Sequence, residues 1–581
     1  MSLRIPLALA LALLFAAVGA RADAPTSIPL GPNSLSACGG DAITPTQVIQ
    51  GQFPFELMGA YVMVPIEVPA GMTQVRVKYC WEGGGHTVDL GLWQAREGAA
   101  PWGEAQFRGW GGSSHPDVSV TAQGFSDEAD YLADPRGHVP GRTTRGFLPG
   151  PIPEGTWAIE LGVAAVVPVA DGDEDGLADF RVEVALSSDP AYAAEPYEPA
   201  PYDDFPANTE PGWYAGDLHV HAEHSALGDA TMAETFEYAF APLGEGAGLD
   251  FITLTDYVTT SAWGEIGRHQ SQHPGKLVIR SSEIITYQGH ANAHGHLRYV
   301  DHRLGGPVYE LDPADGDLAL LRAGRDPAQA FADVQAAGGA VQLNHPTTYP
   351  SHIPINRRRC RGCPWDFTAE QTEFASVDAI EIHNGSPLAY GFTPSAIAFW
   401  DAQLAAGHAI AAVGVSDSHK GGCTRLSCDA TQSPIGQATT VVYAEELSEQ
   451  GILDGVRDGH TYVKLFGNDG PDLRFEADGD QGGSGIMGDA LLDTAATLTA
   501  TVLNVPQDEA LRELRLVRDG EVAESVAILP PGDEIDFRAE TPGRYRIQLV
   551  ETESNRIVAL TSAITVPEPG GALAALGRER R

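Results

Sequence analysis

The chain has 581 residues, of which 43% are hydrophobic, and this composition is typical of a globular protein rather than a disordered one. Its length allows three or four domains of ordinary size. The formal net charge of -42 argues against nucleic acid and anionic membranes as partners, because a strongly negative protein is repelled by both.

The first residues have the pattern of a secretory signal. Arg4 provides a positive charge, an apolar stretch too short for a bilayer crossing follows, and Ala20, Arg21 and Ala22 form an A-x-A cleavage site. We therefore expect a signal peptide over 1–22 and a mature protein that is periplasmic, secreted or at the cell surface, with no transmembrane segment. In such an oxidising compartment the six cysteines predict disulfides, and a four-thiolate zinc knuckle built from CRGC and CTRLSC is the alternative.

Residues 23–195 alternate between polar and apolar in short segments such as AYVMVPIEV and GTWAIELGV. A period of two, interrupted by Gly and Pro, predicts the antiparallel strands of a β-sandwich. One turn, DGDEDGLAD, has aspartates at the spacing of a calcium loop: Asp171, Asp173, Asp175 and Asp179. Val182 stands where such a loop has its glutamate, so calcium binding and a plain acidic turn both stay open. A linker rich in Pro, Ala and acidic residues follows over 196–212.

Residues 213–465 have a different pattern, in which apolar strand-like segments alternate with helical ones. GLDFITLTD and VDAIEIH read as strands, and DPAQAFADVQAAGG and PSAIAFWDAQLAAG as helices. Repeated strand–helix units predict a parallel sheet, and their number favours a barrel. Residues 466–565 return to alternation, in ATLTATVLNV and RYRIQLVE, which predicts a second, Ig-like sandwich. The tail over 566–581 resembles a degenerate PEP-CTERM sorting signal.

Side chains that bind metals recur where the predicted barrel strands end. His219 and His221 end the first strand and, being two positions apart, point to the same side of it. Further candidates follow later strands: Asp256, Glu283, His290, His294, His296, His345, His383, Asp417 and His419. Because the active site of a parallel barrel lies at the carboxyl ends of its strands, we expect these residues to converge on a metal centre. Cysteines are not expected among its ligands.

The same segments carry a family resemblance. HVH, TDY, SSEIITYQGH, NHP and SDSH occur in this order and together resemble the motifs of the PHP (polymerase and histidinol phosphatase) superfamily. The N-terminal segment, with RGWGG, resembles the CehA/McbA branch, the carbaryl-hydrolase-like metallohydrolases. The resemblance implies an α/β fold, with a distorted (β/α)7 barrel that is flanked here by N-terminal and C-terminal β-sandwiches, and two or three metals.

Carried over by position, the resemblance places four ligands around one metal: His219, His221, Glu283 and Asp417. It makes Glu283 a bridge to a second metal, which His290 and His345 also hold. Imidazole and carboxylate ligands together fit zinc, manganese or iron, and the sequence does not decide among them.

A third metal of this family would use His419 and the histidine of a T-D-H motif. Tyr257 stands in that position here, and a neutral phenol is a poor ligand. His224 and Asp229 are candidate substitutes. We expect two divalent metals, with the third weak or absent.

Two metals that share a water deliver hydroxide, which predicts hydrolysis of a phosphoester, carbamate or carboxylic ester in a small molecule or polymer. Asp256 and His383 are candidates to accept or orient the proton of that water. The basic segment after His345 is a candidate site for an anionic substrate group, with a solvated surface loop as the alternative. Its arginines are Arg357, Arg358, Arg359 and Arg361. The rival function, favoured by Tyr257, is a metal-containing surface or carbohydrate-binding protein without turnover.

Overall fold

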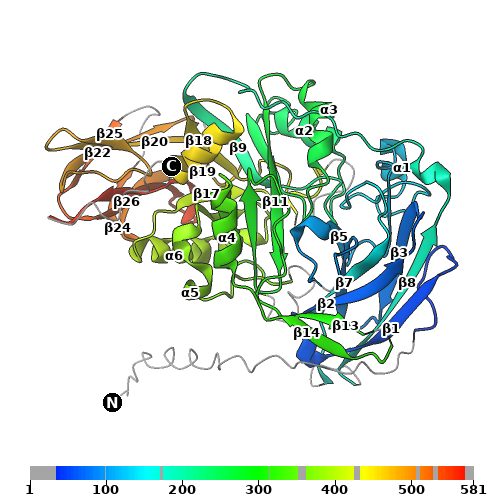
Figure 1. The fold of residues 1–581 in the computed structure, drawn as a ribbon. Helices are drawn as coiled ribbons and strands as arrows, with labels where there is room; N and C mark the ends of the chain where they lie inside the picture. Colours follow the sequence, from blue (N-terminus) through cyan, green and yellow to red (C-terminus); the bar gives the residue numbers. More distant parts are fainter. Residues whose placement is uncertain are drawn as a thin grey trace, which may run out of the picture.

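Three β-rich bodies lie side by side in the order of the chain (Figure 1). The structure is a computed structural model that describes residues 35–98, 100–169, 175–312, 314–350, 361–423, 432–505, 511–527 and 534–569. The expected signal peptide and sorting signal therefore fall outside the described residues, except for 566–569. In the described ranges, no helix has the length and apolar character needed to cross a membrane.

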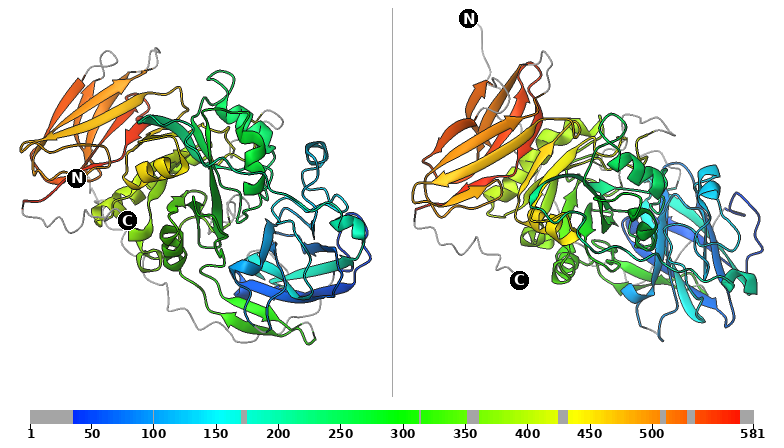
Figure 2. Two further views of the ribbon diagram at one scale, coloured as in Figure 1. Left: turned by 45° about the horizontal axis from the view of Figure 1, so that its top comes forward. Right: turned by 90° about the horizontal axis from the view of Figure 1, so that it is seen from above.

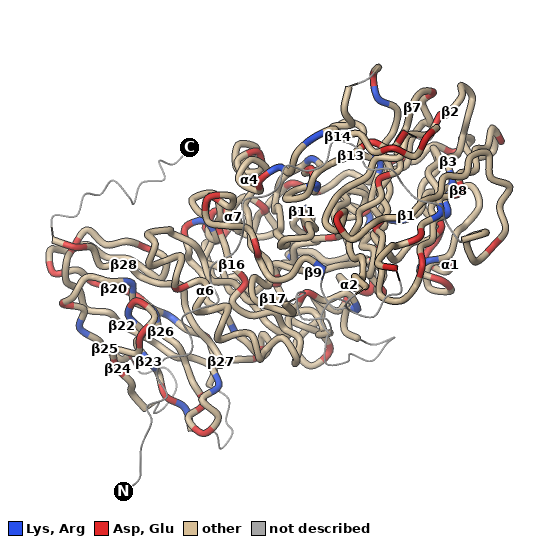
Figure 3. The backbone as a smooth tube through the Cα atoms, turned by 90° about the horizontal axis from the view of Figure 1, so that it is seen from below, with Lys and Arg blue, Asp and Glu red and all other residues tan. Residues whose placement is uncertain are grey.

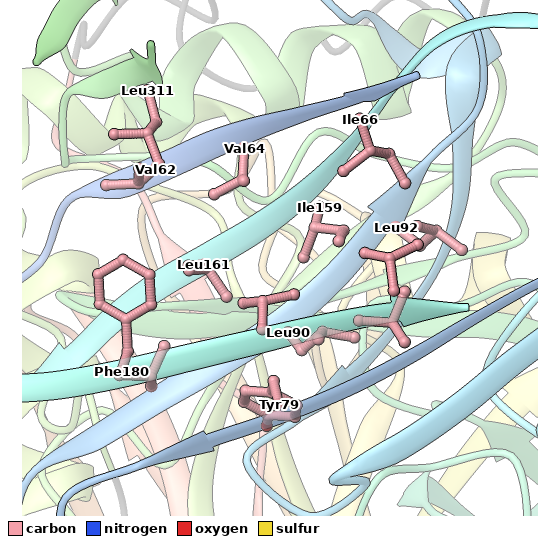
Figure 4. Close-up of a cluster of buried hydrophobic side chains, with 14 of the residues drawn as sticks. Val62, Val64, Ile66, Tyr79, Leu90, Leu92, Ile159, Leu161, Phe180 and Leu311 are labelled. Atoms are coloured by element: carbon pink, nitrogen blue, oxygen red, sulfur yellow. The ribbon is translucent and has the colours of Figure 1, made fainter. Parts of the chain in front are cut away.

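The N-terminal body is built from two sheets that pack face to face. One sheet has the order β1 (Gln47–Pro54), β8 (Leu177–Ser187), β3 (Gln74–Trp81), β6 (Asp117–Thr121). The other has the order β14 (Leu318–Arg322), β13 (Val308–Leu311), β2 (Tyr61–Val68), β7 (Gly155–Ala165), β4 (Thr87–Trp93), β5 (Phe107–Gly112). Alternate residues of both sheets, such as Val62, Leu90 and Phe180, fill the space between them (Figure 4). Truncating one of these side chains to alanine costs about 2–5 kcal/mol.

This first body is tied together by a disulfide and completed by residues from far along the chain. Cys38 and Cys80 form a disulfide, as the even number of cysteines predicts. The hairpin of β13 and β14 lies in the segment expected to be all barrel, yet Val308–Glu310 pairs in parallel with Tyr61–Met63. The central body is therefore joined to the N-terminal one through a shared sheet, and Figure 1 shows the green hairpin beside the blue strands.

The central body is mixed α/β. Its strands are β9 (Gly212–Val220), β10 (Phe251–Leu254), β11 (Leu277–Thr286), β12 (Gly289–His294), β15 (Ala340–Asn344), β16 (Ala379–Asn384), β17 (Ala411–Val415), β18 (Thr439–Ala444) and β19 (Thr461–Lys464). Its helices are α2 (Met232–Phe240), α3 (Trp263–Gln270), α4 (Pro327–Ala336), α5 (Ala369–Thr372), α6 (Thr393–Ala405) and α7 (Glu449–Arg457). A further helix, α1 (Glu128–Ala133), belongs to the N-terminal body.

The strand pairing does not show the expected distorted (β/α)7 barrel. Strands β9, β10 and β11 are parallel, as are β15, β16 and β17, but β12 runs antiparallel between the two groups. The reason is the short connection from β11 to β12, which turns back at Tyr287 and leaves no room for a crossover helix. The resulting order, β17-β16-β15-β12-β11-β10-β9-β18-β19, is an open series of pairs.

The C-terminal body continues the central sheet and adds a second one. Strand β19 pairs with β27 (Arg556–Thr561), which is followed in the sheet by β26 (Gly543–Glu551), β23 (Arg512–Arg518) and β24 (Glu521–Ala527), while β28 (Ile564–Val566) pairs with β26. The second sheet has the order β21 (Ser484–Ile486), β20 (Asp472–Gly479), β22 (Ala496–Leu503), β25 (Glu534–Ala539). Both sheets contribute to one apolar core, and this body lies on the far side of the central one from the N-terminal sandwich (Figure 2).

Candidate metal centre

Seven side chains with metal-binding groups meet where β9, β11, β15 and β17 end or pass the same point. His219 lies in β9 and Glu283 in β11, while Asp417 follows β17. The remaining four are His221, His290, His345 and His419. His219 and His221 are fully buried, and the Asp417 side chain is 21% exposed. Backbone hydrogen bonds from Asp417 N to His219 O (3.0 Å) and from His221 N to Ser418 O (2.9 Å) join the segment after β17, the terminal strand of the sheet, to the end of β9.

Four of these side chains form a compact first group. His219 Nε2 lies 3.2 Å from Glu283 Oε2 and 3.4 Å from Asp417 Oδ1. His221 Nε2 lies 3.4 Å from Glu283 Oε2 and 3.2 Å from Asp417 Oδ1. Two atoms that each bind a tetrahedral ion at about 2.1 Å are about 3.4 Å apart, so these spacings fit a single divalent metal.

The other oxygen of Glu283 faces a second group. Glu283 Oε1 lies 3.3 Å from His290 Nδ1 and 3.6 Å from His345 Nε2. The sulfur of Cys363 is also near, but it is disulfide-bonded and therefore cannot act as a thiolate ligand. Glu283 thus presents one carboxylate oxygen to each group, which is the arrangement a bridging ligand needs.

Two polar atoms inside the first group suit a bound cation. His221 Nε2 and Asp417 Oδ1 are buried and make no hydrogen bond, although they lie 3.2 Å from each other. Buried polar atoms nearly always have one, so both atoms suit a bound cation. The backbone is also strained here, because His345 and Asp417 have φ angles of 28° and 52°, which side chains other than glycine rarely adopt. Such strain is commonly found at functional sites.

Glu381 orients two of the histidines and was missed by the sequence analysis. Its Oε1 accepts hydrogen bonds from His219 Nδ1 (2.7 Å) and Gln342 Nε2 (2.9 Å), and its Oε2 accepts one from the His345 backbone N–H (2.6 Å). A carboxylate on the far nitrogen of a metal-binding histidine fixes the ring and its tautomer. The signal available in the sequence was a lone acid within the apolar strand VDAIEIH.

Other groups hold the remaining ligands in place. Asn344 Nδ2 donates to Glu283 Oε1 (3.0 Å), and His290 Nε2 donates to the Arg361 carbonyl (2.8 Å), which leaves Nδ1 of that ring for a metal. Asp217 accepts from the backbone N–H groups of His219, Ser416 and Gly436, so it fixes β9 against two loops.

The electrostatics of the cluster favour a positive ion. Burial alone would lower the pKa of His219, but the carboxylates of Asp417, Glu283 and Glu381 outweigh burial and hold that pKa well above its usual value. Burial lowers the pKa of His221. Burial would likewise raise the pKa values of Glu283 and Asp417, and the histidines reverse this and keep both below their usual range. The acids therefore stay ionised next to imidazoles, as metal ligands must.

Tyr257 forms a hydrogen bond with His419 Nε2, the atom that would bind a third metal. Its hydroxyl lies 2.8 Å from His419 Nε2, while His419 Nδ1 lies 3.0 Å from the Asp417 carbonyl. Burial raises the pKa of Tyr257 well above its usual value, so the phenol stays neutral and its O–H donates a hydrogen bond to Nε2. Neither expected substitute joins the cluster, since His224 Nδ1 contacts Ser261 Oγ (2.9 Å) and Asp229 lies 3.6 Å from Arg136.

A cavity of about 300 Å³ opens onto the two groups. His290, His345 and Asp417 line it from the central body, and Asp89 and Trp110 line it from the N-terminal sandwich. Arg361 also lines the cavity, and its Nη1 donates to Ser113 Oγ (3.0 Å). The other arginines of the basic segment, Arg357, Arg358 and Arg359, lie outside the described residues.

The two residues expected to handle protons do not line this cavity. Asp256 Oδ1 accepts from the Ala222 N–H (2.8 Å), and burial raises the Asp256 pKa to about 7. His383 Nδ1 lies 2.7 Å from Thr393 Oγ1, and its ring packs against Tyr390 and Phe466. The pairing of β16 with β17 shifts between positions 381 and 383, as in a β-bulge, and this is why residues two apart do not face the same site.

The candidate calcium turn is only partly described. Asp171 and Asp173 lie outside the described residues. Asp175 Oδ1 accepts from the Leu177 N–H (3.0 Å), and Asp179, in β8, accepts from Gln52 Nε2 (2.7 Å). Calcium binding there stays a prediction.

Two further candidate histidines, His294 and His296, belong to neither ligand group, and His294 contacts Ser281 Oγ (2.9 Å).

No family model matches the chain, and no curated protein matches it. Two solved structures are similar to it. One is a two-domain protein from Bacteroides vulgatus that contains a predicted PHP-like metal-dependent phosphoesterase, with 18% identity, 64% of this chain and 99% of that chain covered, and a TM-score of 0.31. The other is a lesion-specific endonuclease from Pyrococcus furiosus, with 13% identity, 42% of this chain and 56% of that chain covered, and a TM-score of 0.27. Both TM-scores are below 0.5, so neither likeness carries an argument about this chain.

Proposed function

We propose that this chain is a PHP-type metal-dependent hydrolase that cleaves a phosphoester at a centre of two divalent metals. The observation that carries the proposal is Glu283, whose two carboxylate oxygens face two separate groups of ligands. The buried atoms His221 Nε2 and Asp417 Oδ1, which make no hydrogen bond, support it. The wider proposal includes the CehA/McbA branch, export, and a distorted (β/α)7 barrel that would close where the segment after β17 bonds to the end of β9.

The residues that would hold the metals follow from the two groups. His219, His221 and Asp417 would hold one ion with Glu283, and His290 and His345 would hold the other with the same Glu283. Zinc, manganese and iron all suit this mixture of nitrogen and oxygen donors. When bound, the two metals would supply hydroxide from a shared water and polarise the substrate oxygen.

The chain itself would position and shield the reaction. Glu381 holds the ring of His219, and the Arg361 carbonyl holds that of His290, so the ligands need little reorganisation. The Tyr257 hydroxyl holds His419 at the rim of the cavity. Asp256 and His383 do not line the cavity, so neither is assigned a role in proton transfer.

Arg361 favours a phosphoester over carbamates and carboxylic esters. Arg361 lines the cavity, its guanidinium contacts Ser113 of the same lining, and guanidinium groups bind phosphate through paired hydrogen bonds. Acidic residues occur along all three bodies, so a small anionic group inside the cavity suits this protein better than a nucleic acid on its surface (Figure 3). A small molecule or a neutral polymer that carries the ester is the proposed substrate.

The test compares nitrophenyl phosphate, a nitrophenyl carbamate and nitrophenyl acetate with protein loaded with zinc, manganese or iron. Arg361→Ala should lower kcat/KM for the phosphate by about tenfold or more, as expected for a lost charged hydrogen bond, and change the acetate far less. Arg76→Ala, which removes a surface arginine paired with Asp117, is the matched control.

Equal losses on both substrates would contradict the role of Arg361. Metal binding without turnover on any of the three substrates would instead favour a metal-containing binding protein. An active enzyme that prefers the carbamate would place the cleavage in the other substrate class.

A further inference from the structure

One wall of the cavity is made by the N-terminal sandwich rather than by the body that carries the metal ligands. Trp110 and Gly112 of β5, and Ser113 just after it, line the cavity together with Asp89 of β4. Figure 1 shows β5 facing β11 of the central body. The sandwich is therefore in a position to contact whatever part of a substrate extends away from the metals.

Asp89 is an unusual residue for such a wall. It is 4% exposed, yet it lines the cavity, and apart from Asp417 it is the acid among the described lining residues. Its Oδ2 accepts a hydrogen bond from the Tyr287 hydroxyl (2.9 Å). Among the described residues it forms no ion pair, although Arg361 is near enough for its charge to lower the Asp89 pKa. A buried acid without an ion-pair partner is costly, and a ligand that brings a donor would relieve this cost.

The position of Asp89 is fixed by a close fit between the two bodies. Tyr287 leaves the central body at the β11–β12 turn and stacks on Tyr61 of β2, with ring centroids 5.2 Å apart. Its hydroxyl reaches Asp89 over Gly162 of β7, where a Cβ atom would overlap that hydroxyl. The carboxylate is thus held in one orientation and is not a mobile surface group.

The cavity lining therefore contains groups that suit an anion and a group that suits a cation. The two metal groups and Arg361 offer binding to an anion, and Asp89 offers binding to a donor or a cation. Burial raises the pKa of Asp89 and the attraction of Arg361 opposes this, and an ammonium next to the carboxylate would also favour its ionised form.

We propose that Asp89 is a specificity-determining residue that binds an amino group on the alcohol part of the substrate, so that the preferred substrate is an amino-alcohol phosphoester. This inference rests on the proposed phosphoester hydrolysis. It also gives the N-terminal sandwich a role in substrate selection.

The test uses two probes of the same size, O-phosphoethanolamine and propyl phosphate, with the full-length metal-loaded protein. The wild-type protein should prefer phosphoethanolamine in kcat/KM by about tenfold or more, since a buried charged hydrogen bond discriminates to this extent. Asp89→Asn should bring the ratio close to one. Asp117→Asn, the same substitution on the sandwich at a surface ion pair with Arg76, should keep the wild-type ratio.

Tyr287→Phe separates recognition from a merely structural role. It removes the hydrogen bond to Asp89 but keeps the carboxylate, so the preference for phosphoethanolamine should persist. If Tyr287→Phe abolishes the preference as fully as Asp89→Asn does, the pair is structural and the inference is overturned.

The outcomes distinguish this inference from the proposed function. If the wild-type protein hydrolyses both probes equally well, Asp89 selects nothing while phosphoester hydrolysis stands. If neither probe is hydrolysed, the proposed function fails for these substrates, and calorimetric titration of the metal-loaded protein with both probes then decides about Asp89. Equal affinity for the two probes would overturn the inference, and tighter binding of phosphoethanolamine that Asp89→Asn removes would support it.

Discussion

Replacing Glu381 by glutamine changes one atom and should weaken both metal sites. In the native structure, Glu381 Oε1 faces His219 Nδ1 and Gln342 Nε2, and Oε2 faces the backbone N–H of His345. A glutamine must point its NH₂ group at one of these positions, and every group there is itself a donor. Either His219 turns or changes its tautomer, or the segment that carries His345 moves.

The size of the effect follows from the role of such carboxylates. Removing the hydrogen-bond partner of a metal-binding histidine typically weakens metal affinity about 10- to 100-fold, which corresponds to about 1.4–2.7 kcal/mol. Because His219 belongs to the first ligand group and His345 to the second, Glu381→Gln should weaken the binding of both ions, whereas the loss of a single ligand would affect mainly one.

Competition between the protein and a zinc chelator measures this effect at each site. Glu310→Gln is the matched control, because Glu310 pairs with Arg96 in the N-terminal body, away from the ligands. The reasoning is refuted if Glu381→Gln binds two zinc ions as tightly as the control does.

Two further predictions concern stability. Gly162→Ala should destabilise the protein by about 1–3 kcal/mol in thermal unfolding, because the new Cβ displaces Tyr287. Gly83→Ala adds a Cβ in open space and should change the stability little. Equal effects of the two substitutions would contradict the close fit at this interface. The pKa of the buried Asp256 is raised from 3.8 to about 7, so the folded state prefers the protonated acid. The free energy of unfolding of the metal-free protein should therefore fall by about 3 kcal/mol as pH rises from about 4 to 7. Urea unfolding across this pH range should show a shallower decline for Asp256→Asn, and identical slopes would show that Asp256 does not titrate in this way.

The sequence predicted best where a pattern is local. Alternation of polar and apolar residues indicated strands such as β2 and β7, and two histidines two positions apart in β9 indicated side chains on one face. These inferences need only the geometry of a single strand. The convergence of β9, β11 and β15 on one point was expected from a different rule, that the site of a parallel fold lies at the carboxyl ends of its strands, and metal binding by their histidines stays a prediction.

The features that the sequence did not indicate depend on contacts between distant segments. The β13–β14 hairpin pairs with β2 across more than two hundred residues, and the sequence of the hairpin does not indicate which strand it pairs with. His383 looked like a site residue and Glu381 did not, because the shift in pairing at this position of β16 cannot be read from strand alternation. Asp89 appeared to be one more residue of a sandwich strand until the fold placed it in the cavity of another body.

The most direct measurement is an anomalous-difference map from crystals of the zinc-loaded protein. The account predicts two strong peaks on either side of the Glu283 carboxylate. One would lie within about 2.0–2.3 Å of ligand atoms of His219, His221 and Asp417, and the other at the same range from His290 and His345. A single peak, or peaks that do not share Glu283, would contradict the two-metal centre.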